Sequence, residues 1–333
     1  MESQETWYER RPWLLAVVIL IFIFVIIFCY IYMLYGNVYL SYPKHNFHHE
    51  KWMEQLSPQT QLKDIVFPGS HDSLIFEPVK FKTKYDNIAE DAIKFQKLSF
   101  IPGINYKVNR WTQTQNSIIL KQLNNGIRAF DFRIAEKDNI CYGFHTFLGS
   151  ELKPSLDDIK TFLKQNPKEI ILLSVRTDDD LCKDLIYDSL NDKIFHYNPT
   201  DNLKNLTLED LWARNKNVII SDWQDSKIII SDWLNSYDEE EKINYLEDHL
   251  KIRLTEDDEN NNEFYNLEWT LTPQTKQVGF HSDSLLYSSY KFNQKLSKFL
   301  KTLPPQLKDQ INILSIDNSS SFDLYALIER TFY

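Results

Sequence analysis

The amino-acid sequence predicts an α/β fold, a distorted (β/α)8 TIM-type barrel preceded by one N-terminal transmembrane helix. Short apolar runs alternate with longer amphipathic stretches, which is typical of parallel βα units. The apolar runs end in polar or charged residues, and parallel barrels collect their chemistry at the carboxyl ends of their strands. A doubly wound sheet usually carries a Gly-rich phosphate loop, and this chain has none.

The predicted strands are the runs 65–67, 126–134, 142–145, 169–175, 217–223 and 311–316. Amphipathic stretches predict helices over 155–165, 181–190 and 285–303. The segments NVIISDW (217–223) and KIIISDW (227–233) form a near-repeat, too closely spaced to hold a crossover helix. We expect one of them to be a strand and the other a hairpin partner or a helix start.

The N-terminal apolar run indicates whether the chain contains a membrane-spanning helix. Trp13 to Tyr35 carries no charge and is long enough to span a hydrocarbon core of about 30 Å. A buried core helix is one alternative, but the run has no polar face at any helical period. A cleaved signal peptide usually has a shorter apolar region that ends in small residues. We therefore favour a single membrane-spanning helix over both alternatives.

The charges that flank this helix predict its orientation. Arg10 and Arg11 precede the helix, whereas the other flank has no charge before Lys44. The positive-inside rule then keeps the N-terminus cytoplasmic and places the rest lumenal or extracellular. The triplets Asn205-Leu-Thr207 and Asn318-Ser-Ser320 are compatible with that side.

These observations predict four regions: a cytoplasmic N-terminus (1–12), a transmembrane helix (13–35), a stalk (36–59) and a catalytic barrel (60–333). The stalk contains His45, His48 and His49, for which we expect a solvated linker and not a metal site, because no acidic or Cys ligands accompany them.

Composition excludes some functions. The formal net charge of −10 argues against a nucleic-acid partner, because binding phosphate backbones needs an excess of Lys and Arg. Three cysteines are too few for a disulfide framework. Since Cys29 lies in the apolar run, at most Cys141 and Cys182 could pair, and buried thiols are the favoured interpretation. The sequence predicts no oligomeric state.

The first candidate site is the motif PGSHDS (68–73), in which Pro-Gly turns the chain after an apolar run. It presents His71 and Asp72 at a strand end. Histidine suits proton transfer near neutral pH because its ordinary pKa is about 6.5. Taken alone, His71 fits better as a structural histidine that is hydrogen-bonded to a turn.

Further candidates end other predicted strands. Asp131 and Arg133 share one face of their strand because side chains alternate with period two. A buried Arg133 would need an anion, either one of the neighbouring carboxylates or a phosphate. His145 ends the run GFH (143–145), and Asp317 ends the last run, where its carboxylate suits holding an imidazole tautomer.

The motifs PGSHDS, QLNNGIRAFDFRI (122–134) and GFH, in this order, resemble the X-box of phosphatidylinositol-specific phospholipases C. RWTQTQNSIILKQL (110–123) and WTLTP (269–273) resemble more narrowly the X-domain-containing group that lacks accessory domains. The resemblance covers about residues 60 to 333 and implies a barrel fold and an inositol phospholipid substrate at a membrane surface.

By this resemblance, His71 is the general base that deprotonates the inositol 2-hydroxyl and His145 the general acid that protonates the departing oxygen. Asp317 would pair with the base, and Arg133 would stabilise charge on the phosphate. Proton removal on one side of a phosphate and delivery on the other suit in-line displacement.

The same resemblance assigns the remaining positions. Asp72 and Asp131 would orient the cation and the phosphate-side network, and Arg176 would face the substrate. Calcium-dependent relatives carry an acidic ligand where this chain has Arg133, so we expect no metal and no cofactor. The stretch 78–110 would rim the site or pack on the barrel, and His281 is expected to be structural.

We therefore predict a metal-independent phosphodiesterase that cleaves phosphatidylinositol-type lipids. A phosphodiesterase for another glycerophospholipid is one alternative, although its usual Glu metal ligands are not evident at the first two strand ends. A catalytically weak barrel that binds phosphoinositides is another, but it would not need His71 and His145 together. The residues that contact the inositol ring do not match clearly, so no head-group preference is predicted.

Overall fold

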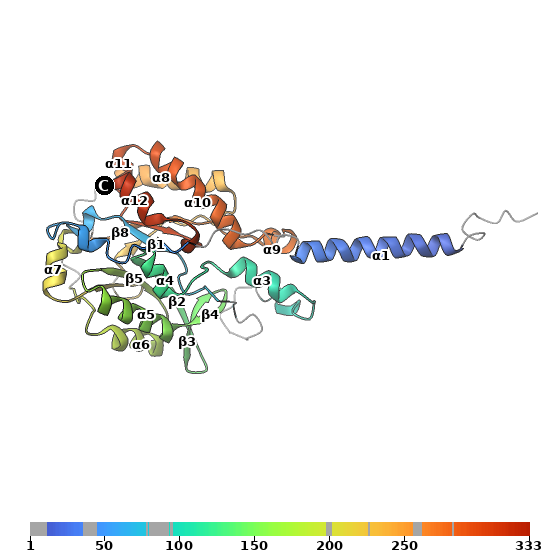
Figure 1. Cartoon of the computed structure of the whole chain (residues 1–333), viewed down its shortest axis with the longest axis horizontal. Helices are drawn as coiled ribbons and strands as arrows, with labels where there is room; N and C mark the ends of the chain where they lie inside the picture. The colour runs from blue at the N-terminus through green and yellow to red at the C-terminus, as the bar shows by residue number, and fades with distance from the viewer. Residues whose placement is uncertain are drawn as a thin grey trace, which may run out of the picture.

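A computed structural model of the chain describes residues 12–35, 45–77, 79, 93, 96–197, 202–225, 227–255, 262–281 and 283–333. A long helix, α1, projects from an α/β body that contains all the strands (Figure 1). The predicted cytoplasmic segment with Arg10 and Arg11, and residues 36–44 of the predicted stalk, lie outside the described residues.

The strands are β1 Phe67–Ser70, β2 Ala129–Lys137, β3 Ile140–His145, β4 Phe147–Glu151, β5 Ile171–Arg176, β6 Val218–Asp222, β7 Ile229–Ile230, β8 Phe264–Trp269 and β9 Ile313–Ile316. The α-helices are α1 Pro12–Tyr35, α3 Ile104–Thr112, α4 Ile119–Asn124, α5 Leu152–Gln165, α6 Asp180–Leu190, α7 Leu208–Ala213, α8 Glu239–Thr255, α9 Thr275–Phe280, α10 Leu285–Thr302, α11 Pro305–Lys308 and α12 Leu324–Phe332. Short 3-10 helices are η1 Met53–Gln55, η2 Leu62–Asp64, η3 Leu203–Asn205 and η4 Ser319–Ser321.

The sheet runs β6-β5-β2-β1-β9-β8-β7, and every neighbouring pair in this order is parallel. The predicted α/β barrel architecture is therefore confirmed, although the described chain has seven parallel strands and not eight. No backbone pairing joins β6 to β7 in the described residues. Instead, the amides of Ile228 and Ile229 donate to Ser221 Oγ at 3.0 and 2.9 Å.

Two strand predictions need correction. The segment 227–233 is not a hairpin partner or helix start, because β7 pairs parallel with β8. Strand β8 was missed in the sequence, since its buried Asn266 and Glu268 interrupt the apolar pattern. A further departure from simple βα alternation is the antiparallel extension β2-β3-β4.

The inward positions of the strands change from apolar to polar along the barrel axis. One apolar cluster takes a residue from each parallel strand: Phe67, Ala129, Leu172, Ile219, Ile229, Phe264 and Ile313. Two residues further along their strands, Gly69 pairs with Ser315, and Asp131 pairs with Ser174. Gly69 is required there, because a Cβ would overlap Ser315 Oγ. The barrel therefore has an apolar floor below a polar mouth.

Part of the predicted stalk (36–59) packs on the barrel, although most of its described residues are exposed. Trp52 and Met53 are buried and belong to the same apolar cluster as Phe67. His49 contacts Asp323 through Nε2 at 3.0 Å. The physical reason is the apolar floor, which would be open to water without the Trp52 and Met53 side chains.

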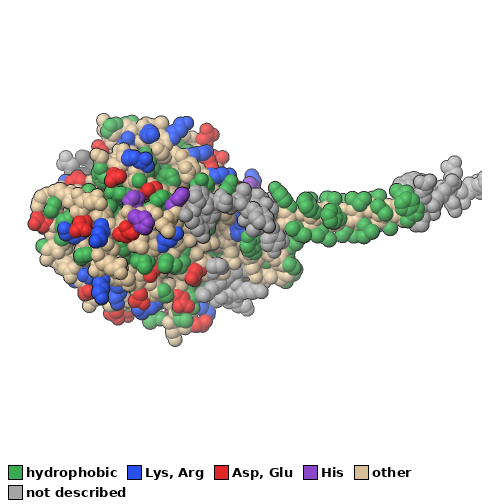
Figure 2. All heavy atoms as spheres, viewed as in Figure 1, with side chains coloured by type: hydrophobic (Ala, Val, Ile, Leu, Met, Phe, Trp, Pro, Cys, Tyr) green, Lys and Arg blue, Asp and Glu red, His purple; other side chains and the backbone are tan. Residues whose placement is uncertain are grey.

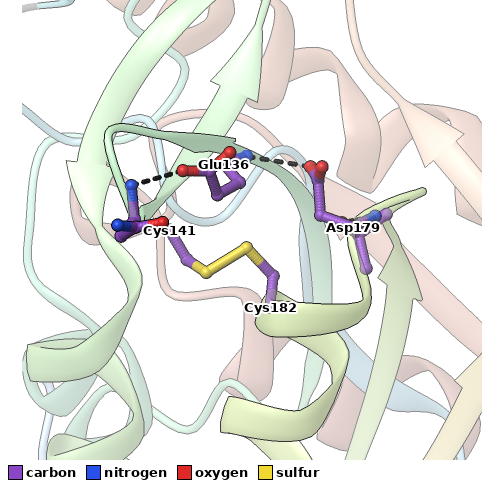
Figure 3. Close-up of a disulfide and its surroundings, with 6 residues drawn as sticks. Glu136, Cys141, Asp179 and Cys182 are labelled. Carbon is purple, nitrogen blue, oxygen red and sulfur yellow. Dashed lines mark hydrogen bonds between the residues drawn. A yellow bond between two sulfur atoms is a disulfide. The ribbon is translucent and has the colours of Figure 1, made fainter.

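A disulfide between Cys141 and Cys182 joins β3 to α6, with the two Cα atoms 5.6 Å apart (Figure 3). The prediction of two buried thiols is therefore wrong, because folding brings positions 41 residues apart in the sequence within bonding distance. Beside it, the amide of Glu136 donates to Asp179 Oδ2 at 2.8 Å (Figure 3). The disulfide holds β3, which carries His145, against α6, and the Glu136 contact joins β2 to the residue that precedes α6.

Helix α1 is apolar over its whole length, in contrast to the mixed surface of the barrel (Figure 2). Among the described helices it alone is long and apolar enough to cross a membrane, although a signal sequence near an N-terminus has the same properties. Its Tyr30 hydroxyl donates to Pro102 O at 2.6 Å, beside α3. The carboxyl ends of the strands thus face the end of the body where α1 emerges (Figure 1).

We expect Cys141→Ser to lower the free energy of unfolding by about 2–4 kcal/mol, because a disulfide mainly restricts the unfolded chain. Urea unfolding of the full chain in detergent would measure the change. Cys29→Ser is the matched control, since Cys29 is a free thiol on α1. An identical unfolding midpoint for wild-type protein with and without reductant would contradict the disulfide.

Candidate active site

The site begins where β1 and β9 end side by side. Ser70 pairs with Ile316, so the next residues, His71 and Asp317, meet at the mouth of the barrel. His71 Nδ1 lies 2.9 Å from Asp317 Oδ1, and both side chains are buried. A carboxylate that accepts from Nδ1 leaves Nε2 as the proton-accepting nitrogen, which is the arrangement of an oriented general base.

Asp72 lies at the centre of the site. Its backbone is left-handed (φ 41°), which turns the side chain inward from the end of β1. Arg133 Nε lies 2.8 Å from Asp72 Oδ1, and Arg133 Nη2 lies 2.9 Å from Asp131 Oδ2. The alternation in β2 therefore works as predicted, since Asp131 and Arg133 share the inward face.

His145, at the end of β3, also lies close to Asp72. Its Nε2 lies 3.5 Å from Asp72 Oδ2, the same separation as His71 Nε2 from that oxygen. The two imidazole rings are 6.5 Å apart between centroids and nearly perpendicular. Arg133 Nη2 also lies 3.1 Å from His71 Nε2, so the guanidinium is next to the base and both carboxylates.

The pKa of His71 is set by burial and by neighbouring charges, which act in opposite directions. Burial lowers the pKa of His71, but Asp72 and Asp317 outweigh it and raise that pKa to about 9, with Arg133 offsetting part of the rise. Arg133 can only donate, so its contact with Nε2 corresponds to the unprotonated base. The site thus holds His71 between two carboxylates that favour its proton and one cation that disfavours it.

The carboxylate at the centre is held in its charged form. Burial alone would raise the pKa of Asp72, but Arg133, followed by His71 and His145, brings it well below its usual range. The pKa of Arg133 is raised in turn: burial opposes the rise, and Asp131 and Asp72 cause it. Asp72 and Arg133 therefore each favour the charged form of the other.

Arg176, the last residue of β5, joins the site beside Arg133. In the register of the sheet the two arginines are paired, and burial together with the Arg133 charge lowers the pKa of Arg176. Its guanidinium stacks on the Trp223 ring at 3.5 Å from the centroid. Arg133, His145 and Arg176 line a cavity of about 530 Å³, which Asp178 and Asp179 also line.

Sequence reasoning did not assign several residues around the site. Glu268 of β8 is buried near both arginines and has one oxygen without a hydrogen-bond donor in the described residues. Gln115 Nε2 donates to His71 O at 2.9 Å and to Ile316 O at 3.0 Å, and thus ties β1 to β9. Gln115 belongs to the sequence motif 110–123, but only the fold shows that its side chain binds the backbone of His71 and Ile316.

Two other sequence candidates lie apart from this centre. His281 packs its ring near Tyr237 at 6.4 Å, which fits the structural role expected for it. In the stretch 78–110, Lys107 is buried and its ammonium donates to Gly279 O at 2.8 Å. The part of that stretch between 80 and 92 lies outside the described residues.

One group of side chains could in principle hold a metal ion. His71, Asp72 and Asp131 offer ligand atoms within 4.8 Å of one another. However, the Arg133 guanidinium contacts both carboxylates and the histidine. A divalent cation would therefore have to displace a fixed positive charge, so the donor set fits the guanidinium better than a metal.

The fold and the site together define an α/β barrel with two histidines and an arginine around a carboxylate at its mouth. No family model matches the chain. PI-PLC X domain-containing protein 2 of Homo sapiens is 32% identical over 183 residues, which cover 51% of this chain and 58% of that protein. The 1-phosphatidylinositol phosphodiesterase of Staphylococcus aureus is 32% identical over 134 residues, 39% of this chain and 35% of that protein.

The phosphatidylinositol-specific phospholipase C of Listeria monocytogenes has the same fold, with a TM-score of 0.59 at 19% identity. The match covers 85% of this chain and 98% of that one. The resemblance to the PI-PLC X domain group is therefore confirmed in sequence, and the fold in structure. The matched region spans little more than half of the human relative's length.

We expect Asp317→Asn to move the ascending limb of kcat/KM against pH toward lower pH by about 1 unit or more, because the variant loses a charge that raises the pKa of His71. The raised pKa keeps His71 protonated up to about 9 in the wild type, so base-form activity rises with pH toward that value. Ser289→Ala is the control, since Ser289 contacts Asp317 Oδ2 without a charge. An unshifted limb in Asp317→Asn would show that His71 is not the titrating base.

Proposed function

We propose that this protein is a membrane-anchored phosphodiesterase that cleaves phosphatidylinositol-type lipids without a metal ion. The observation that carries the proposal is that His71 and His145 both approach Asp72 Oδ2, while Arg133 binds the other oxygen of the same carboxylate. A phosphodiester held by Arg133 would have one imidazole near its attacking oxygen and the other near its leaving oxygen. The names of the relatives support the same lipid class.

In the proposed reaction, His71 Nε2 takes the proton of the inositol 2-hydroxyl, and that oxygen attacks the phosphorus. The bond from phosphorus to the glycerol oxygen breaks, and His145 protonates the departing diacylglycerol. The product is a cyclic inositol phosphate. Arg133 offsets the charge that builds on the phosphate, and Asp317 stabilises the imidazolium formed on His71.

Arg176 is the second cation proposed for substrate binding. Stacking on Trp223 fixes the plane of its guanidinium, so its donors point in a defined direction. Glu268 has a buried oxygen free to accept from a hydroxyl. A ring that carries hydroxyl groups next to its phosphate would satisfy both residues, which favours a polyol head group.

We propose that α1 spans the membrane with the N-terminus cytoplasmic and the barrel, residues 60–333, on the lumenal or extracellular side. Two observations support this orientation. The Cys141–Cys182 disulfide belongs to oxidising compartments. The mouth of the barrel also faces the end where α1 emerges, so the site would lie toward the bilayer that contains its substrate (Figure 1).

The test of the reaction is release of water-soluble inositol phosphate from phosphatidylinositol in mixed micelles by the full chain. We expect His71→Ala and His145→Ala each to lower kcat by about 10²–10⁴-fold, because each removes one proton-transfer group. His281→Ala is the matched control and should retain wild-type activity. No soluble product from the wild-type protein would refute the proposed activity on this lipid.

Metal independence makes a second prediction. We expect full activity in excess chelator and no stimulation by calcium, because Arg133 already supplies the cation between Asp72 and Asp131. Arg133→Lys should lower kcat by roughly 10²-fold or more, since an ammonium cannot contact both carboxylates in the same way. Arg330→Lys, on the exposed face of α12, is the control. Loss of wild-type activity in chelator would refute the claim.

A further inference from the structure

Two Asn-X-Ser/Thr triplets in the chain have no part in the proposed reaction. They are Asn205-Leu-Thr207 and Asn318-Ser-Ser320, and both would lie on the non-cytoplasmic side in the proposed orientation. Such triplets are acceptors for an N-linked oligosaccharide. The fold makes the two sites very different, because an attached glycan must stay in water after the chain has folded.

The Asn318 triplet is closed to a glycan in the folded protein. Asn318 is fully buried directly after Asp317, in a left-handed turn with φ 54°. Its Nδ2, the atom that would carry the sugar, donates to Leu286 O at 2.7 Å. A glycan on this nitrogen would break that bond and force a polar oligosaccharide into the wall of the catalytic centre.

The Asn205 triplet is accessible to a glycan in the folded protein. Asn205 is exposed at the end of η3, and its Oδ1 accepts from Lys63 Nζ at 3.1 Å. This bond orients the side-chain amide and leaves Nδ2 without an acceptor in the part of the chain that the structure describes. The Thr207 hydroxyl, the other required group, caps α7 by accepting from the amide of Asp210 at 3.2 Å.

The position of Asn205 also suits a glycan. The segment that follows η3 pairs with the chain before β1, where the amide of Leu62 donates to Leu206 O at 2.9 Å. This is the amino-terminal end of the strands, opposite His71 and the other catalytic groups. In Figure 1, α7, which begins just after Asn205, lies at the end of the body farthest from α1. A glycan there would contact neither the membrane nor the substrate.

We infer that Asn205 carries an N-linked oligosaccharide and that Asn318 does not. The donor is a lipid-linked oligosaccharide diphosphate: Nδ2 of Asn205 forms a bond to the anomeric carbon, the lipid diphosphate leaves with the bonding electron pair, and the amide loses one proton. The inference rests on the proposed orientation of α1. It does not depend on the phosphodiesterase activity, so an inactive protein would carry the same glycan.

The experiment is expression of the full chain in a eukaryotic cell, followed by electrophoresis before and after treatment with an endoglycosidase that removes N-linked glycans. We expect one glycan on the wild-type chain, none on Asn205→Gln or Thr207→Ala, and one on Thr207→Ser, which keeps both the triplet and the helix cap. Because the glycan lies away from the site, Asn205→Gln should retain the specific activity of the wild type.

A reporter variant separates the acceptor site from the orientation. Lys193→Thr creates a new triplet at Asn191, which is exposed on the turn after α6. A glycan on Lys193→Thr with none at Asn205 would overturn the acceptor assignment and keep the orientation. Absence of any glycan from both would overturn the inference together with the orientation. A glycan that persists in Asn205→Gln would show that another acceptor is used.

Discussion

The parallel pairing of β1 with β9 is the constraint on which the rest of the site depends. These strands come from opposite ends of the barrel sequence, and four consecutive register pairs align them. Gly69 permits the close approach, because any side chain there would collide with Ser315. Once Ser70 lies beside Ile316, the next residues, His71 and Asp317, are adjacent and their side chains meet.

Charge balance at the barrel mouth explains why the other residues lie where they do. Asp72 is buried, and a buried carboxylate is costly unless it is paired. Arg133 supplies the pair from the neighbouring strand and binds Asp131 as well. The same carboxylate is equally distant from His71 and His145, so one buried charge contacts both imidazoles. Removing Arg133 would therefore disturb binding, geometry and protonation together.

Sequence patterns predicted several of the residues that meet at the barrel mouth, because these residues lie at the ends of recognisable strands. The inward alternation from Ala129 through Asp131 to Arg133 is legible from period two alone. Strand β8 was not legible, because Asn266 and Glu268 are polar residues at positions where an apolar run was expected. Both side chains are buried, and each has an oxygen without a hydrogen-bond donor in the described residues, although Glu268 lies near the charges of Arg133 and Arg176. A strand with polar inward positions therefore lacks the apolar run by which the neighbouring strands are predicted.

The sequence by itself determined the α/β class, the apolar N-terminal helix and the order of the motifs that carry His71, Arg133, His145 and Asp317, because these depend on local periodicity and on residue chemistry. Only the tertiary structure decided that Cys141 bonds Cys182, that Trp52 closes the floor of the barrel, and that Asn205 is exposed while Asn318 is buried. Each of these outcomes depends on which distant segments come into contact. The local sequence does not predict such contacts, because they form between elements that are far apart in the chain.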